Sequence, residues 1–156
     1  MRHLSLKDKL CVAVSSLFGI GWVPLLPGTT ASAAGVLVFL LLKNNLLYLI
    51  FTFISIVLSF LLSSRAEKIF AEKDSKKIVI DDFSGMLLAM LFIPRTPQFI
   101  FCAFFLFRAL DMVKIPPADK IEKCPGALGV VGDDLVAGIY ANIILHLVRG
   151  ILAIFS

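Results

Sequence analysis

Long apolar segments separated by short polar links run through most of this chain. Hydrophobic residues make up 59% of its 156 residues, and its mean hydropathy is +0.96. A helix needs about 20 predominantly apolar residues to cross a bilayer, and the segments 44–64 and 133–155 meet that length. Lipid leaves no partner for an unpaired backbone group, so helices are the expected structure. The sequence therefore predicts an all-α, polytopic membrane bundle that forms a single domain over residues 1–156.

Three further segments complete the expected bundle. The segment 97–113 is rich in phenylalanine, and 78–93 is apolar but shorter. The N-terminal region is apolar too, but Pro24 and Pro27 interrupt it. Broken backbone at membrane depth survives only where protein or a wet cavity covers it. We therefore expect an interfacial or re-entrant first piece, a buried bend, a first span near 30–42, and about five spans in all.

Basic residues are distributed unevenly among the polar links. They gather in the N-terminus and in the links 63–77 and 114–132, whereas the two alternate links carry one basic residue each. Cytoplasmic loops carry the excess of lysine and arginine, so the N-terminus and both basic links are predicted to be cytoplasmic. The net charge of +4 then reflects topology or attraction to anionic lipid. No nucleic-acid partner is expected.

Ionisable and hydroxyl residues stand at the ends of the apolar segments, and the predicted topology brings them all to the cytoplasmic face. An ionisable group at membrane depth is costly and usually functional. Paired carboxylates beside a cation are the groups that hold a divalent metal against a phosphate. The candidate site residues are Gly28, Thr29, Thr30, Asp81, Asp82, Arg108, Asp111, Lys114, Asp133 and Asp134.

Two pairs of adjacent aspartates, 81–82 and 133–134, each stand at the start of a predicted helix. Gly85 and Gly138 each follow one helical turn later and would allow a neighbouring helix to approach closely. Metal binding or catalysis is one interpretation of these pairs. Helix capping and compensation of the helix dipole is the other.

Two further groups are ambiguous in the same way. Arg108 and Asp111 share a helix face at i and i+3, and Lys114 extends that face. They form either a structural ion pair or a site where the two cations bind phosphate. Thr29 and Thr30 open another helix, where backbone amides and hydroxyls either cradle an anion or serve as ordinary caps.

Four motifs in order resemble the phosphatidylglycerophosphatase A family of bacterial membrane lipid phosphatases. They are a glycine-rich, double-proline stretch ending Pro-Gly-Thr at 19–29, Asp-Asp-x-x-Gly at 81–85, Phe-Arg-x-x-Asp-x-x-Lys at 107–114, and Gly-x-x-x-Asp-Asp-x-x-Ala-Gly at 129–138. The likeness runs from Gly19 to about Tyr140. Asp82 stands where the family usually has glutamate, which shortens the side chain but keeps its charge.

The resemblance implies a Mg2+-dependent phosphatase of the bacterial cytoplasmic membrane. Its reaction would convert phosphatidylglycerophosphate, a phospholipid substrate, to phosphatidylglycerol and inorganic phosphate at the cytoplasmic face. Our hypothesis is one or two Mg2+ ions, a nucleophile that is either water or an aspartate, and a phosphate held by basic, hydroxyl and backbone groups. The expected metal ligands are Asp81, Asp82, Asp111, Asp133 and Asp134, and the expected phosphate contacts are Gly28, Thr29, Thr30, Arg108 and Lys114.

Two other functions compete with this one. A small cation-coupled transporter would suit intramembrane acids and a broken first helix. Its acids should lie near the membrane midplane, whereas these cluster at one face. A phosphatidyltransferase that uses a CDP-activated lipid would carry an Asp-Gly-x2-Ala-Arg pattern, which this sequence lacks.

Overall fold

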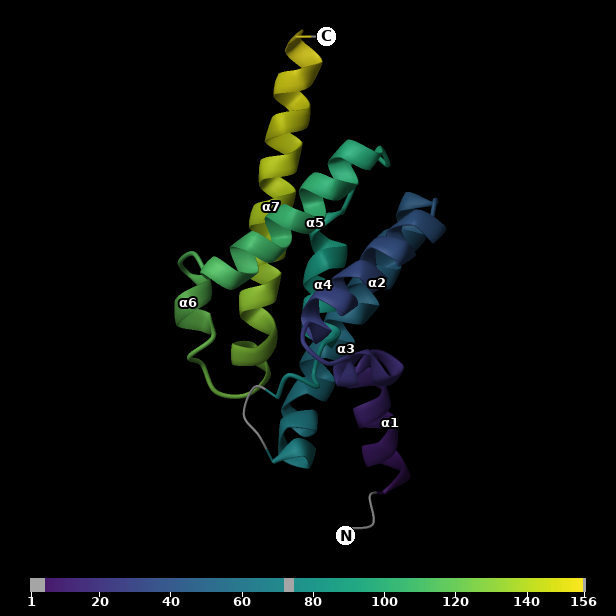
Figure 1. The fold of residues 1–156 in the computed structure, drawn as a ribbon, viewed down its shortest axis with the longest axis vertical. Helices are drawn as coiled ribbons and strands as arrows, with labels where there is room; N and C mark the ends of the chain where they lie inside the picture. Colours follow the sequence, from purple (N-terminus) through teal and green to yellow (C-terminus); the bar gives the residue numbers. More distant parts are fainter. Residues whose placement is uncertain (1–4, 72–74, 156) are drawn as a thin grey trace.

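The computed structural model describes residues 5–71 and 75–155, and over these residues it is all-helical with no strand (Figure 1). The predicted fold class is confirmed to that extent. The elements are α1 (Leu6–Ser15), the 3-10 helix η1 (Leu17–Trp22), α2 (Pro27–Leu41), α3 (Asn45–Phe70), α4 (Ile80–Ala89), α5 (Pro97–Val113), α6 (Ala118–Ile121) and α7 (Ala127–Phe155).

Two helices, α3 and α7, are long and apolar enough to cross a membrane, with 26 and 29 residues. Helix α2 is apolar but shorter. Helix α4 has 10 residues and therefore rises only about 15 Å, half of a hydrocarbon core of about 30 Å. The prediction of about five spans is thus not confirmed, because the described residues contain two helices of span length.

The expected interruption of the N-terminal region is present, but the prediction that its bend is buried is wrong, because residues 23–26 are exposed. Helix α1 ends at Ser15, η1 follows it, and α2 begins at Pro27. Proline suits the first turn of a helix because the missing N–H would have no intrahelical partner there. The backbone N–H of Val79 donates to the carbonyl of Ser15 over 3.0 Å, which ties this region to the residues just before α4.

Helix α4 lies at the centre of the bundle, in contact with α2, α3, α5 and α7 (Figure 1). All of its residues except Asp82 and Leu88 are buried. Its apolar side chains join a core that includes Val79, Met86 and Phe107. A helix buried on nearly every face is positioned by its neighbours, so its first turn is held in a fixed place.

Helices α4 and α7 approach each other closely at two glycines. A Cβ atom added to Gly138 would lie 2.5 Å from the carbonyl oxygen of Gly85. One added to Gly85 would lie 2.7 Å from the carbonyl oxygen of Asp134. The two backbones therefore touch, as the spacing of these glycines predicted, and Asp134 comes to lie beside the first turn of α4.

The last carbonyls of α4 end inside the bundle and are satisfied by side chains of α3 and α7. A buried helix end needs such partners, because no water reaches it. The hydroxyl of Tyr48 donates to the Leu87 carbonyl over 2.8 Å. Asn142 Nδ2 donates to the carbonyls of Ala89 and Leu91, over 3.1 Å and 2.9 Å. These bonds fix the inner end of α4.

Candidate metal and phosphate site

A polar cavity of about 350 Å³ lies where the first turns of α2 and α4 and the second turn of α7 meet the end of α5. Buried carboxylates line it together with basic side chains. The ionisable residues that line it are Lys76, Asp81, Asp82, Arg108, Asp111, Lys114, Asp133 and Asp134. The structure thus gathers the predicted charged residues, which come from segments far apart in the sequence, around one space.

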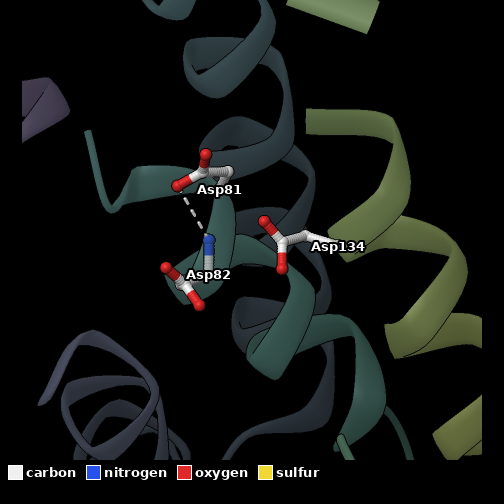
Figure 2. Close-up of side chains that lie close together, drawn as sticks. All are labelled: Asp81, Asp82 and Asp134. Carbon is white, nitrogen blue, oxygen red and sulfur yellow. Dashed lines mark hydrogen bonds between the residues drawn. The ribbon is translucent and has the colours of Figure 1, made fainter. Parts of the chain in front are cut away.

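Three aspartates in this cavity converge on one point. Ligand oxygens of Asp81, Asp82 and Asp134 all lie within 4.8 Å of one another. Figure 2 shows the Asp134 carboxylate reaching from α7 toward the two aspartates of α4. Asp81 and Asp134 are only 5% and 6% exposed. Burying several carboxylates together is costly unless a cation balances them.

Two carboxylate oxygens in the cavity have no protein partner. Asp133 Oδ1 and Asp134 Oδ1 are buried and accept no hydrogen bond from the described residues. Such an atom costs free energy unless something binds it. A hard divalent cation takes carboxylate oxygens as ligands, so the residues present fit a hard divalent metal ion.

The aspartates at 133–134 do not cap a helix. Helix α7 begins at Ala127, so these residues lie in its second turn, and its first turn contains no acidic residue. The favourable interaction of an acid with the helix dipole falls off beyond the first turn. Helix capping therefore does not explain this pair. Asp81 and Asp82 do lie in the first turn of α4.

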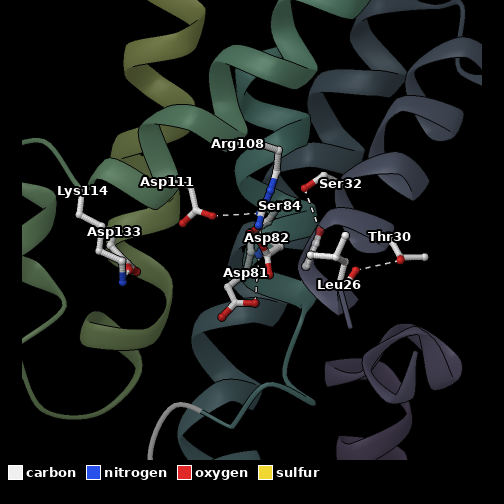
Figure 3. A network of polar contacts seen from close by, with 11 residues as sticks. Leu26, Thr30, Ser32, Asp81, Asp82, Ser84, Arg108, Asp111, Lys114 and Asp133 are labelled. Atoms are coloured by element: carbon white, nitrogen blue, oxygen red, sulfur yellow. Dashed lines mark hydrogen bonds and ion pairs between the residues drawn. The ribbon is translucent and has the colours of Figure 1, made fainter. Parts of the chain in front are cut away.

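Arg108 bridges two of the carboxylates. Its Nη1 atom lies 2.9 Å from Asp111 Oδ2 and also forms an ion pair with Asp82 Oδ1 (Figure 3). The predicted pair of Arg108 and Asp111 on one helix face is present. The additional partner, Asp82, joins α5 to α4, so the guanidinium holds an aspartate of the cluster in place.

Lys114 occupies the other side of the cavity, just past the end of α5. Its Nζ atom lies 2.9 Å from Asp133 Oδ2 and 2.7 Å from Glu122 Oε1. Burial lowers the pKa of the Lys114 ammonium, but hydrogen bonds to Glu122 and Asp133 outweigh this and raise the pKa above its ordinary value. Lys114 is therefore a permanent cation at neutral pH. Glu122 is a contact that the sequence analysis did not single out.

The start of α2 contributes backbone rather than hydroxyl groups. A Cβ atom at Gly28 would overlap the Asp82 carboxylate, so only glycine allows this contact. The Thr30 hydroxyl instead donates to the Leu26 carbonyl over 2.9 Å (Figure 3). Neither Thr29 nor Thr30 lines the cavity. Of the three residues predicted to contact phosphate here, the structure brings Gly28 to the site.

Lys76 is a cavity residue that the sequence analysis missed. It lies in the link before α4, is exposed, and lines the same cavity as the aspartates. Unlike Arg108 and Lys114, it forms no ion pair within residues 5–71 and 75–155. In the sequence, the one indication that Lys76 lies near the site was its position five residues before Asp81. The basic residues of that link were interpreted as marking the cytoplasmic side of the membrane.

Comparison with protein families distinguishes between the candidate functions of the chain. The model of a family described as phosphatidylglycerophosphatase A matches residues 13–149. The chain belongs to this family. The matched part contains every aspartate of the cavity, and membership makes the chain an enzyme, a phosphatase.

Individual relatives agree with the family match. The phosphatidylglycerophosphatase A of Haemophilus influenzae is 33% identical over 137 residues, which are 85% of this chain and 84% of that protein. The Escherichia coli phosphatidylglycerophosphatase A is 32% identical over 136 residues, 84% of this chain and 78% of the relative. A Bacteroides thetaiotaomicron protein provisionally named a phosphatidylinositol-3-phosphatase is 28% identical over 153 residues, 92% and 96% of the two chains. No solved structure matches the chain significantly.

Proposed function

We propose that this chain is a Mg2+-dependent lipid phosphatase that hydrolyses the terminal phosphomonoester of phosphatidylglycerophosphate to phosphatidylglycerol and inorganic phosphate. The observation that carries the proposal is the cluster of Asp81, Asp82 and Asp134 in a cavity also lined by basic residues, where Asp134 Oδ1 accepts no hydrogen bond from the described residues. Two curated relatives named phosphatidylglycerophosphatase A support the substrate.

The three clustered aspartates are the proposed ligands of a first Mg2+ ion. Asp133 has one buried oxygen without a hydrogen bond and would be a further ligand, or would accept the proton of an attacking water. Asp111 is held by Arg108 and lies at the edge of the site. A bound Mg2+ ion would neutralise charge on the phosphoryl oxygens and favour nucleophilic attack.

Three cations of the chain have distinct proposed roles toward the phosphate. Arg108 and Lys114 are already paired with aspartates, so they orient those carboxylates and add positive charge beside the phosphoryl group. Lys76 has no ion-pair partner in the described residues and is long enough to bind a phosphate oxygen directly. Five aspartates and three basic residues line the cavity, so a divalent cation is needed before a phosphate dianion can enter.

In the proposed reaction the phosphorus atom gains one oxygen and loses its ester bond to glycerol. The incoming oxygen comes from water, either directly or after an aspartyl-phosphate forms on one of the carboxylates. The glycerol oxygen leaves with a proton and remains part of phosphatidylglycerol. The net reaction consumes one water and releases one inorganic phosphate per lipid.

We also propose that the chain is a single, multi-pass domain of the bacterial cytoplasmic membrane. Helices α3 and α7 are the full spans, with the N-terminus and the cavity on the cytoplasmic side. Two observations support this orientation. The link that follows α3 and the segment between α5 and α7 both carry several lysines and both border the cavity. An excess of basic residues marks the cytoplasmic side.

A second lipid substrate is favoured by one relative. The Bacteroides thetaiotaomicron protein, named for phosphatidylinositol 3-phosphate, matches almost the whole chain. That lipid also presents a phosphomonoester at a membrane surface, so the same metal and basic residues would bind its phosphate. The two substrates differ in what lies between the phosphate and the acyl chains.

A comparison of substrates tests the proposal. The full chain in detergent micelles with Mg2+ would be given phosphatidylglycerophosphate, phosphatidylinositol 3-phosphate or phosphatidic acid at equal mole fraction, and released inorganic phosphate would be measured. We expect the highest kcat/KM with phosphatidylglycerophosphate. A higher kcat/KM for the inositol lipid would make that lipid the preferred substrate and leave the proposed phosphomonoester hydrolysis unchanged. If folded protein released phosphate from none of the three lipids, both the proposed substrate and the proposed reaction would be contradicted.

A further inference from the structure

An apolar groove of about 270 Å³ lies between α2 and α5, next to the phosphate cavity. Its lining contains no charged or hydrogen-bonding side chain. The lining residues are Ala33, Val36, Ile100, Phe101, Phe104 and Phe105. Ala33, Phe101 and Phe105 are exposed, so the groove opens at the surface of the bundle.

The groove continues from the cavity along its α5 wall. On α5, Phe104 precedes the cavity residue Arg108 by four residues, so the two share a helix face about 6 Å apart along the axis. On α2, the groove residue Val36 follows the cavity residue Gly28 by eight residues, about 12 Å along the axis and about 80° around it. Figure 3 shows Arg108 on α5 and Ser32 on α2 facing each other above the aspartates. Helix α5 thus changes from a polar to an apolar lining within about one turn.

We propose that this groove binds an acyl chain of the lipid whose phosphate occupies the cavity, and that the lipid enters from the bilayer between α2 and α5. The inference rests on the proposed function. A glycerophospholipid has its groups in the same order as the surface: a phosphate, a short polar glycerol segment, and then hydrocarbon. The cavity lining is largely charged, whereas the groove offers hydrocarbon only apolar atoms.

A second apolar groove, of about 500 Å³, lies between α5 and α7 and is the competing place for the chain. Its α7 wall begins at Ile144, ten residues beyond Asp134 and therefore about 15 Å along the helix from the aspartate cluster. Its α5 wall shares Phe105 with the smaller groove and therefore also approaches Arg108. Because its α7 wall begins so far from the aspartates, this larger groove does not reach the cavity along α7.

The substitution Ala33→Trp tests the inference, because Ala33 is exposed and an indole there would fill the groove without entering the core. Hydrolysis would be measured with dioleoyl and with water-soluble dibutyryl phosphatidylglycerophosphate. We expect KM for the dioleoyl lipid to rise roughly tenfold, with kcat for both lipids and KM for the dibutyryl lipid unchanged. Val148→Trp fills the other groove in the same way and should change none of these constants.

A labelling measurement supports the kinetic one without requiring turnover. A non-hydrolysable phosphonate analogue of phosphatidylglycerophosphate with a diazirine in one acyl chain would be irradiated with the wild-type protein and Mg2+, and the labelled residues would be identified by mass spectrometry. We expect labels on Val36 and Phe104, reduced by excess unlabelled lipid. Labels confined to 144–152, or an effect of Val148→Trp in place of Ala33→Trp, would overturn the inference.

The kinetic results also separate this inference from the proposed function. If the wild-type protein hydrolyses both lipids and Ala33→Trp has the same constants, only the groove assignment fails. If the wild-type protein releases phosphate from neither lipid, the proposed function fails, and the groove assignment fails with it.

Discussion

The close contact of α4 with α7 makes Gly138→Ala the most informative single substitution outside the charged residues. The added Cβ would lie 2.5 Å from the Gly85 carbonyl oxygen and 3.2 Å from its carbon, both backbone atoms of a buried helix. Restoring ordinary contact requires the two helices to separate by about 1 Å. Overpacking of this kind costs about 1–3 kcal/mol of stability.

The same separation would move Asp134 away from Asp81 and Asp82. A misplacement of about 1 Å in a catalytic group costs roughly 100-fold in rate, so we expect kcat to fall by about that factor and the Mg2+ requirement to rise. Phosphate release at saturating lipid, over a range of Mg2+ concentrations, measures both effects. Thermal unfolding in detergent measures the loss of stability separately.

Gly150→Ala is the matched control on the same helix. A Cβ there meets nothing within 4 Å, and alanine is a better helix former than glycine, so activity should be unchanged and stability equal or slightly higher. If Gly138→Ala is folded and turns over lipid as Gly150→Ala does, then backbone contact between α4 and α7 is not what positions Asp134, and the reasoning is wrong.

Three further substitutions test other contacts. Lys76→Met should raise KM and weaken product inhibition by inorganic phosphate. Lys77→Met is the control, because the Lys77 ammonium lies over the Phe70 ring, and its steady-state kinetics should be unchanged. Equal effects of the two substitutions would contradict a direct contact between Lys76 and phosphate. Thr30→Val should retain wild-type kcat/KM, because the Thr30 hydroxyl donates to the Leu26 carbonyl at the start of α2. A large loss of kcat/KM would indicate that this hydroxyl contacts the phosphate. Asn142→Ala should lower the unfolding free energy by about 1–3 kcal/mol by leaving the Ala89 carbonyl without its side-chain donor, whereas the Leu91 carbonyl keeps its contact with His146. Denaturation in detergent would show the loss; an unchanged value would mean that another group satisfies the Ala89 carbonyl.

Part of this structure could be predicted from local sequence pattern. The helical class follows from the apolar segments, since lipid permits few alternatives. The glycines one turn after each aspartate pair predicted a close helix contact, and Gly85 and Gly138 make it. The segment 97–113 was predicted with the bounds that α5 has. These features depend on residues near one another in the sequence.

The rest depends on partners that are distant in the sequence. Hydropathy cannot distinguish a helix that crosses lipid from a short one surrounded by protein, so α4 was predicted as a span. Arg108 pairs with Asp82, 26 residues away, whereas local spacing indicated only Asp111. Asn142 bonds to carbonyls more than 50 residues away. Lys76 resembles any other basic residue of a cytoplasmic link until the fold brings it to the cavity.

The most direct test of the account is whether phosphate release depends on a metal bound by the aspartate cluster. Release from phosphatidylglycerophosphate would be followed for the wild-type chain and for Asp134→Asn, first in EDTA and then with added Mg2+. We expect no release in EDTA, full recovery with Mg2+ for the wild type, and little recovery for folded Asp134→Asn. Undiminished release in EDTA, or wild-type release by Asp134→Asn, would contradict the proposed metal site.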